Sequence, residues 1–200
     1  MLKLMLSLTS PFARKVKVAL IEKALPFEEI RVDPWAVPKV LLQANPLSQV
    51  PTLVTDTGET LVNSETILTW LERHAPSPPL LPAGNAEAAR ALAIAGLCQG
   101  MIEMTVAIVL ERRRAPEQQS AALIERRTQA LQRAMAQLEN RFHVQRDRFQ
   151  IDAIGVACAL GYLDLRLPEW SWRKSAPRLT DWQAWAAARP SLQASAPPAV

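Results

Sequence analysis

The sequence predicts an α+β protein in which a small domain of mixed strands and helices precedes an all-helical domain. Strand-like and helix-like segments alternate over the first part of the chain. A proline-rich segment, residues 75–82 (APSPPLLP), then disfavours helix and sheet alike and indicates a boundary. Apolar residues recur at helical spacing through most of the remaining chain. We therefore expect domains at residues 1–76 and 85–200, joined by a linker at 77–84.

Six strands and helices are predicted in the first domain. Their ranges are 3–8, 11–20, 27–32, 52–55, 60–62 and 65–74, with an irregular segment or short helix at 34–43. The strand at 3–8 is a short apolar run, which is typical of a buried strand. The next element, a helix, begins at Ser10 and Pro11, residue types favoured at the N-cap and the first helical position. The second strand keeps Ile30 and Val32 on one face.

A turn that contains Gly58 separates the strands at 52–55 and 60–62, which predicts a hairpin. Asn63 and Ser64 then cap the helix at 65–74. A βαβ unit with a right-handed crossover, followed by a hairpin and a covering helix, builds a small mixed sheet. This order of elements is the thioredoxin-like arrangement.

The second domain is predicted to be a helical bundle. Two stripes of apolar residues step by three or four positions and indicate helices with one buried face. They are Ile94-Leu97-Met101-Met104-Ile108 and Leu131-Met135-Leu138-Phe142. Residues 154–165 are apolar nearly all round, so this helix is expected at the centre of the bundle. Residues 179–186 predict the last helix, closed by Arg189-Pro190, and the tail after Leu192 is expected to be loosely held.

Composition narrows the class of protein. With 49% hydrophobic and 21% charged residues, the 200-residue chain is of the globular type. Cys98 and Cys158 lie far apart in apolar stretches, and the two histidines have no ligand partners nearby, so we expect neither disulfides nor a metal site. We expect no signal peptide, and we interpret residues 91–110 as a buried helix rather than a membrane span. The net charge of +4 is scattered apart from residues 112–114, so neither nucleic acid nor a membrane is an expected partner.

Ser10 is the first candidate for chemistry. A helix N-terminus that follows a buried strand presents unpaired N–H groups and the positive end of the helix dipole, and this environment stabilises a thiolate. Redox enzymes of this arrangement place a cysteine in the turn, but residues 1–97 contain none. A serine hydroxyl can instead donate a hydrogen bond to a thiolate that a small molecule brings. The alternative is that Ser10 only caps its own helix.

Two further positions suit an extended small molecule with charged ends. If the Val50–Pro51 peptide bond is cis, the backbone groups of Val50 face outward and can pair with an extended peptide; otherwise Pro51 is an ordinary edge-strand proline. The helix start at Asn63 and Ser64 suits a carboxylate, and Glu65 suits an ammonium group. A plain cap with an acidic first turn is the alternative for these three residues.

In this order the motifs resemble those of the glutathione transferase superfamily over nearly the whole chain. They are Ser10-Pro11-Phe12-x-Arg14-Lys15, Asn45-Pro46-x-x-x-Val50-Pro51-x-Leu53, Asn63-Ser64-x-x-Ile67, the segment 157–164 and Arg189-Pro190-Ser191. The turn at Ser10 is similar to that of small bacterial members and of the serine-type transferases. The resemblance implies a cytoplasmic homodimer that acts in detoxification. It also implies conjugation of the glutathione thiolate to small hydrophobic electrophiles, with no tightly bound cofactor.

The resemblance also implies a role for each residue of the site. Ser10 matches the catalytic serine that holds glutathione as the thiolate. Val50 matches the residue whose backbone pairs with the cysteinyl part of glutathione, and Pro51 matches the cis proline. Asn63 and Ser64 match the pair that holds the γ-glutamyl end.

The remaining matches and departures leave alternatives open. Gln49 falls where many members carry a lysine for the glycine carboxylate, and Asn63 replaces the commoner Glu, Gln or Asp. Phe12, Met101 and Met104 would border the site for the electrophile. The acid of the usual capping box before the central helix is shifted by one position. A non-enzymatic glutathione-binding or protein-interaction module is therefore the second hypothesis, and a glutathione-dependent reductase, which lacks an active-site cysteine here, is the third.

Overall fold

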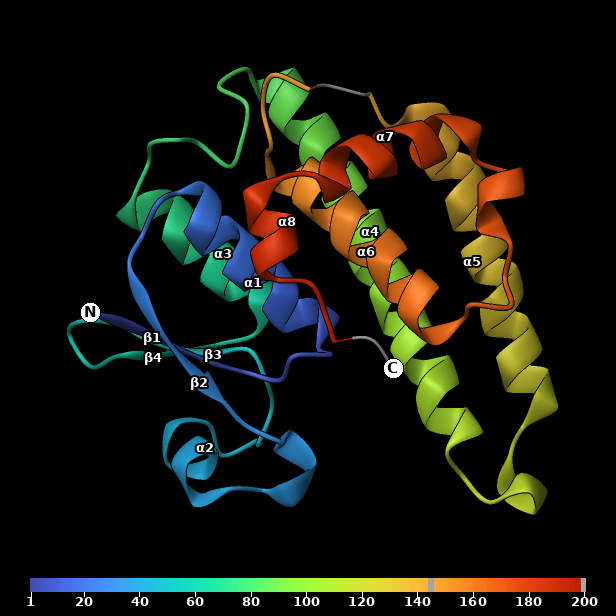
Figure 1. Cartoon of the computed structure of the whole chain (residues 1–200), viewed down its shortest axis with the longest axis horizontal. Coiled ribbons are helices and arrows are strands. Elements are labelled where there is room, and N and C mark those ends of the chain that lie inside the picture. Colours follow the sequence, from blue (N-terminus) through green and yellow to red (C-terminus); the bar gives the residue numbers. More distant parts are fainter. Residues whose placement is uncertain (144–145, 199–200) are drawn as a thin grey trace. The chain divides into compact units, whose positions relative to one another are not determined.

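The structure is a computed structural model that describes residues 1–143 and 146–198. Its contacts divide the chain into two compact units (Figure 1). Unit 1 contains residues 1–82 and the segment that begins at Arg189, and unit 2 contains residues 83–188. The predicted fold class, a thioredoxin-like domain followed by a helical one, is confirmed.

Unit 1 is built on a four-stranded sheet of order β2-β1-β3-β4. The strands are β1 (Leu2–Leu6), β2 (Phe27–Arg31), β3 (Thr52–Val54) and β4 (Thr60–Val62). The helices are α1 (Pro11–Glu22), α2 (Lys39–Ala44), α3 (Ser64–His74) and α8 (Pro190–Ala194), with a 3-10 turn at Pro34–Ala36. Helices α1 and α3 lie side by side against the sheet (Figure 1). The predicted strands and helices of this part are therefore all present.

The register of the sheet brings three loops to one edge. Strand β1 runs parallel to β2, and its last residue, Leu6, pairs with Arg31 at the end of β2. Strand β3 is antiparallel to β1 and β4, so that Thr52 at its start pairs with Met5 and with Val62 at the end of β4. The loop after β1, the loop before β3 and the turn after β4 consequently open on the same edge of the sheet.

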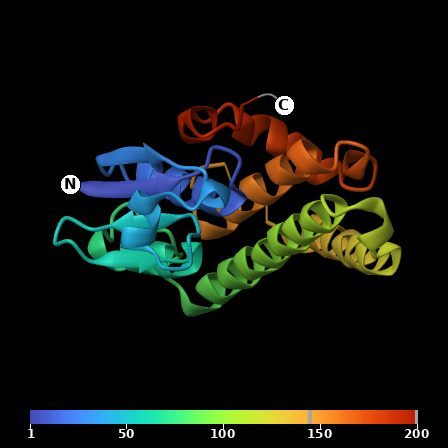
Figure 2. The same ribbon diagram turned by 90° about the horizontal axis from the view of Figure 1, so that it is seen from below.

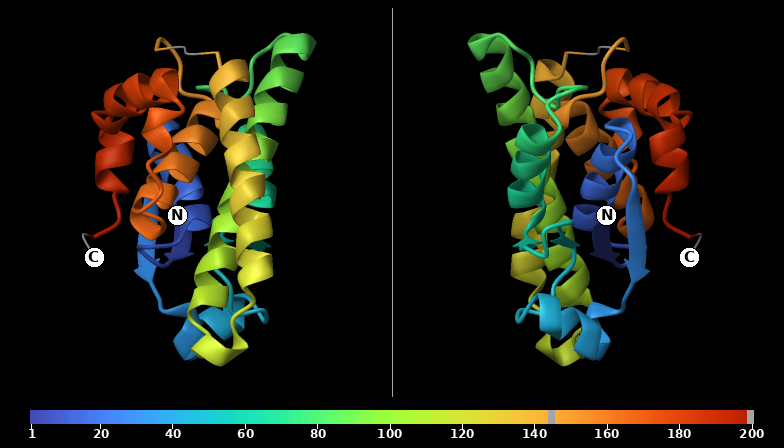
Figure 3. Two further views of the ribbon diagram at one scale, coloured as in Figure 1. Left: turned by 90° about the vertical axis from the view of Figure 1, so that its right-hand side faces the viewer. Right: turned by 90° about the vertical axis from the view of Figure 1, so that its left-hand side faces the viewer.

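Unit 2 is helical. It contains α4 (Asn85–Arg112), α5 (Ala121–Arg141), α6 (Ile151–Arg166) and α7 (Pro177–Ala187), with 3-10 turns at Pro116–Gln118 and Trp172–Lys174. Helices α4 and α5 lie side by side (Figure 3). As its apolar surface predicts, α6 is largely buried, and a Cβ at its Gly155 would lie only 3.2 Å from Cβ of Cys98 on α4. Close packing of α4 against α6 therefore depends on that glycine.

Helix α4 is long and straight (Figure 2). By length and composition it is one helix that could cross a membrane, and 39% of its most apolar window is buried. The buried side faces α6 and α5. The rest of its surface includes Leu92, Met104 and Leu110, each between 38% and 49% exposed.

The end of the chain differs from the expected helical domain of 85–200. Arg189 donates two hydrogen bonds to the Glu22 carboxylate, at 3.1 and 2.7 Å, and Ser191 donates a third. These bonds fasten α8 to the end of α1, so the segment from Arg189 belongs to unit 1. Arg189-Pro190 thus starts a further helix instead of closing the last one. Within the tail after Leu192, Ser195 is buried and its Oγ accepts a hydrogen bond from Arg14 (3.4 Å), so this residue is held against α1.

Candidate functional site

Ser10 is the N-cap residue of α1, and Pro11 occupies the first helical position, as the sequence predicts. Oγ of Ser10 accepts a hydrogen bond from the backbone N–H of Ala13, with 3.2 Å between the two atoms. The backbone N–H of Ser10 donates to the carbonyl of Ser7, which shapes the turn after β1. A hydroxyl that accepts in this way still has its own proton to donate. The cap therefore fixes the hydroxyl in place without using up its capacity as a donor.

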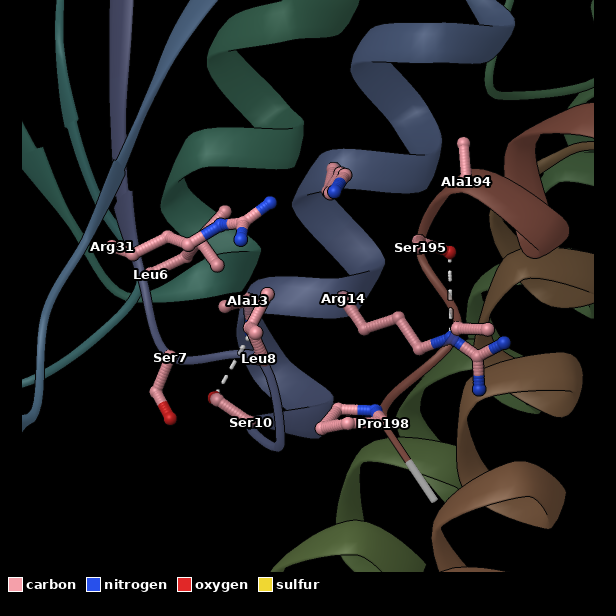
Figure 4. Close-up of a pocket in the computed structure, with 12 residues that line it drawn as sticks. Leu6, Ser7, Leu8, Ser10, Ala13, Arg14, Arg31, Ala194, Ser195 and Pro198 are labelled. Atoms are coloured by element: carbon pink, nitrogen blue, oxygen red, sulfur yellow. Dashed lines mark hydrogen bonds between the residues drawn. The ribbon is translucent and has the colours of Figure 1, made fainter.

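A pocket of about 200 Å³ borders Ser10 within unit 1 (Figure 4). One face of α1, the ends of β1 and β2 and residues 194–198 form its walls. The predicted residues of the β3 and α3 side do not line this pocket. Ser10 consequently stands between two regions: the edge that carries Val50 and Asn63, and the pocket.

The loop before β3 carries Gln49, Val50 and Pro51, and the Val50–Pro51 peptide bond is cis, as the family resemblance implies. Asn45, which is 1% exposed, donates from Nδ2 to the carbonyl oxygen of Gln49 (3.0 Å) and to Oγ1 of Thr52 (3.1 Å). Oγ1 of Thr52 in turn donates to the same Gln49 carbonyl (2.8 Å). This network holds the loop, while the Gln49 side chain is exposed and Val50 is half-buried. In the sequence Asn45 stands out only as part of the Asn45-Pro46 motif, which gives no sign of this structural role.

We expect Asn45→Ala to lower the free energy of unfolding by about 1–3 kcal/mol, because it removes a buried amide with its bonds to Gln49 and Thr52 and leaves the Leu47 N–H without its acceptor, Oδ1 of Asn45. Chemical denaturation measures this loss. Asn85→Ala, which changes an exposed asparagine at the start of α4, is the control and should have a much smaller effect. Equal losses in the two variants would show that Asn45 does not hold the loop.

Asn63 is the N-cap residue of α3, and its Oδ1 accepts from the backbone N–H of Glu65 (2.8 Å). Its φ angle of 73° lies in the left-handed region, which asparagine tolerates better than most residues. This conformation gives a physical reason for asparagine at this position. Ser64, the first helical residue, is 3% exposed, so a ligand would meet it chiefly through atoms at the helix end.

Glu65 already has a cationic partner in the structure. Nζ of Lys15 donates to Oε1 of Glu65, and this ion pair joins α1 to the first turn of α3. The Lys15 side chain is buried, whereas that of Glu65 is 42% exposed. The carboxylate can therefore still meet a ligand, but Lys15 sets its position. Sequence reasoning did not foresee this pair, because its members are 50 residues apart.

The residues expected to border an electrophile differ in how exposed their side chains are. Phe12 is half-buried on the first turn of α1. Met101 and Met104 both belong to α4 in unit 2, where Met101 is 2% and Met104 39% exposed. Their roles stay predictions, and Met104 offers the larger surface. Within residues 1–143 and 146–198, no group of three or more His, Cys, Asp or Glu residues is placed to hold a metal ion.

Comparisons with known proteins find relatives along the whole chain. Residues 4–79 match the family described as the N-terminal domain of glutathione S-transferase, and residues 121–182 match the family described as its C-terminal domain. The uncharacterized GST-like protein YibF of Escherichia coli K12 is 33% identical over 181 residues, which cover 89% of this chain and 90% of YibF.

Two solved structures are similar over their full length. A glutathione S-transferase from Methylobacterium radiotolerans, in complex with glutathione sulfonate, is 33% identical with a TM-score of 0.93, covering 100% of this chain and 96% of that one. A glutathione transferase family member from Pseudomonas fluorescens Pf-5, with bound glutathione, is 34% identical with a TM-score of 0.88, covering 99% and 100%.

Proposed function

The chain belongs to the glutathione S-transferase family, and we propose that it conjugates the thiolate of glutathione to small hydrophobic electrophiles. The observation that carries this proposal is the Ser10 hydroxyl. It is fixed by the α1 cap, keeps a proton to donate, and stands at the sheet edge where the Val50 loop and the start of α3 also open. Relatives that bind glutathione and glutathione sulfonate support the same ligand for this edge.

In the proposed complex, glutathione lies extended along the loop before β3. The backbone of Val50 pairs with its cysteinyl part, as a strand would. The γ-glutamyl end meets the start of α3 at Asn63 and Ser64, where N–H groups favour its carboxylate and Glu65 favours its ammonium group. The exposed amide of Gln49 hydrogen-bonds to the glycine carboxylate in place of an ion pair.

Catalysis then needs the thiol of glutathione to be ionised near neutral pH. The Ser10 hydroxyl donates to the sulfur, and the N-terminus of α1 adds the positive end of its dipole, so both favour the anion and lower the pKa of the thiol. The thiol proton leaves to solvent. The thiolate then forms a bond to the electrophilic carbon, and the leaving group departs with its electron pair.

The wild-type protein tests this function directly. We expect calorimetry to show glutathione binding, and the ultraviolet absorbance of the thiolate to show that bound glutathione ionises at lower pH than free glutathione. Conjugation of several electrophiles should accompany that shift. Binding without a shift and without turnover would favour a non-enzymatic glutathione-binding or protein-interaction module, and absence of binding would overturn both hypotheses.

Two features bear on the remaining expectations. A glutathione-dependent reductase is disfavoured because Cys98 and Cys158 are both buried.

A homodimer is favoured by the exposed apolar side chains of α4. Leu92 and Leu110 are 18 positions apart, which corresponds to five helical turns, so both lie exposed on the same face of the helix. Sedimentation of the wild-type chain and of a Leu92→Glu/Leu110→Glu variant checks this pairing. Cytoplasmic location and a role in detoxification stay predictions.

A further inference from the structure

The pocket beside Ser10 is basic. Arg14 and Lys17 follow Ser10 on one face of α1, at steps of four and three residues, and both line the pocket. Arg31 lines it from the end of β2; Figure 4 labels Ser10, Arg14 and Arg31. Among the described residues that line it, three carry a positive charge and none carries a negative one. We call this feature the basic pocket.

One nearby carboxylate offsets part of this charge. Glu29 on β2 lies 2.6 Å from Nζ of Lys17 and 2.7 Å from Nε of Arg31. Burial alone would raise the pKa of Glu29, but hydrogen bonds from Lys17 and Arg31 hold it below its usual value. Glu29 is therefore ionised and compensates one of the two cations. Within the described part of the chain, no other carboxylate pairs with these side chains.

Arg14 has a different role. Its guanidinium donates to the carbonyl oxygen of Leu192 (3.2 Å) and to Oγ of Ser195 (3.4 Å), both neutral groups. Arg14 thereby fastens the tail that forms one wall of the basic pocket, and its charge adds to the local potential. The single carboxylate of Glu29 thus offsets only part of the positive charge, and the excess favours an anion in the pocket.

The spacing between Ser10 and the basic residues of the pocket decides where the two ends of a bound small molecule would lie. Ser10, where the proposed thiolate lies, is one of the residues that line the pocket. Lys17 lies seven residues further along α1, which corresponds to about 10 Å of helix. A small molecule that offers its reactive carbon to the thiolate would consequently place its other end beside Lys17 and Arg31.

We propose that the electrophile carries an anionic group, most simply a carboxylate, and that Arg31 and Lys17 bind this group in the basic pocket. The proposal rests on the proposed function and narrows its substrate class to electrophilic organic acids with a short apolar body. Arg31 is the principal donor, because only its Nε is bonded to Glu29 and its side chain is 68% exposed. A guanidinium of this kind binds a carboxylate through paired N–H donors.

A matched pair of glutathione conjugates tests the proposal by calorimetry, independently of turnover. S-(2-carboxyethyl)glutathione and S-propylglutathione differ in the charge at the end of a three-carbon tail. We expect the wild-type protein to bind the carboxylated conjugate at least about tenfold more tightly, which corresponds to 1.4 kcal/mol. The difference should shrink as salt is added.

Single substitutions show which side chains cause the preference for the carboxylated conjugate. Arg31→Gln should remove most of the preference and leave the affinities for glutathione and S-propylglutathione within about twofold of wild type. Lys17→Gln should act in the same direction, and Arg73→Gln, at an exposed arginine near the end of α3, should change nothing. The proposal is overturned if the wild type shows no preference, or if Arg31→Gln weakens glutathione itself, which would assign the pocket to glutathione. If neither conjugate nor glutathione binds, the proposed function fails as well.

Discussion

Ser10→Ala is expected to lower kcat/KM for glutathione conjugation by about 10²–10³-fold, the usual cost of losing one donor to a developing or bound anion. The bound thiol should at the same time titrate closer to the pKa of free glutathione, because the hydroxyl no longer stabilises the thiolate. Steady-state kinetics and the thiolate absorbance of the bound ligand measure the two effects. Both effects depend on the Oγ of Ser10, which accepts from Ala13 and retains its own proton.

The same substitution also removes a helix cap, at a cost of about 1 kcal/mol in the free energy of unfolding. Ser120→Ala is the matched control, because Ser120 caps α5 through a bond from the Leu123 N–H but stands outside the proposed site. It should lose similar stability and keep its activity. Ser10→Thr should keep both cap and hydroxyl, and Ser10→Asp should keep the cap alone. An active Ser10→Asp protein would show that Ser10 only caps its helix.

Much of unit 1 could be predicted because its signals are local. Ser10 and Pro11 mark a helix start by their own residue types, and the turn at Gly58 lies between two short strands. Segments as short as these are decided by neighbouring residues in the sequence. The end of the chain could not be predicted in this way, because α8 is held by a bond between Arg189 and Glu22, which are 167 residues apart.

The residues of the candidate site also differ in whether local sequence signals mark them or only the fold brings them together. The candidate residues at the edge of the sheet could be proposed from the sequence because their motifs occur as a recognisable set. The basic pocket was not found, since Lys17 and Arg31 look like ordinary surface charges until the parallel pairing of β1 with β2 brings the end of β2 beside α1. The partner of Glu65 was missed for the same reason: Lys15 reaches it only through the packing of α1 on α3.

Lys23→Met is expected to lower the free energy of unfolding by about 3 kcal/mol, the lower end of the range for breaking a buried ion pair, because the Glu72 carboxylate that it leaves behind is 24% exposed. The Lys23 side chain has no exposed surface, and its Nζ donates to Oε2 of Glu72 (3.1 Å) and to the carbonyl oxygens of Ala75 (2.5 Å) and Pro78 (2.8 Å). Oε2 of Glu72 also accepts from the backbone N–H of Leu80 (2.8 Å). The pair thus holds the proline-rich segment against α1 and α3.

A double variant separates two contributions to that loss: the missing hydrogen bonds of Lys23 and the Glu72 charge left without its cation. In Lys23→Met the half-buried Glu72 carboxylate loses its cation and keeps only its hydrogen bonds from the Leu80 and Leu81 N–H groups. Lys23→Met/Glu72→Gln removes the charge and keeps an acceptor for the Leu80 N–H, the shorter of the two bonds, at the cost of the weaker bond from Leu81. The double variant should therefore be more stable than the single one. Lys3→Met is the control, since Lys3 and Glu28 are 3.5 Å apart and about half exposed, and such pairs contribute about 0–1 kcal/mol. Equal losses from Lys23→Met and Lys3→Met in chemical denaturation would show that burial of the Lys23 ammonium does not anchor this segment.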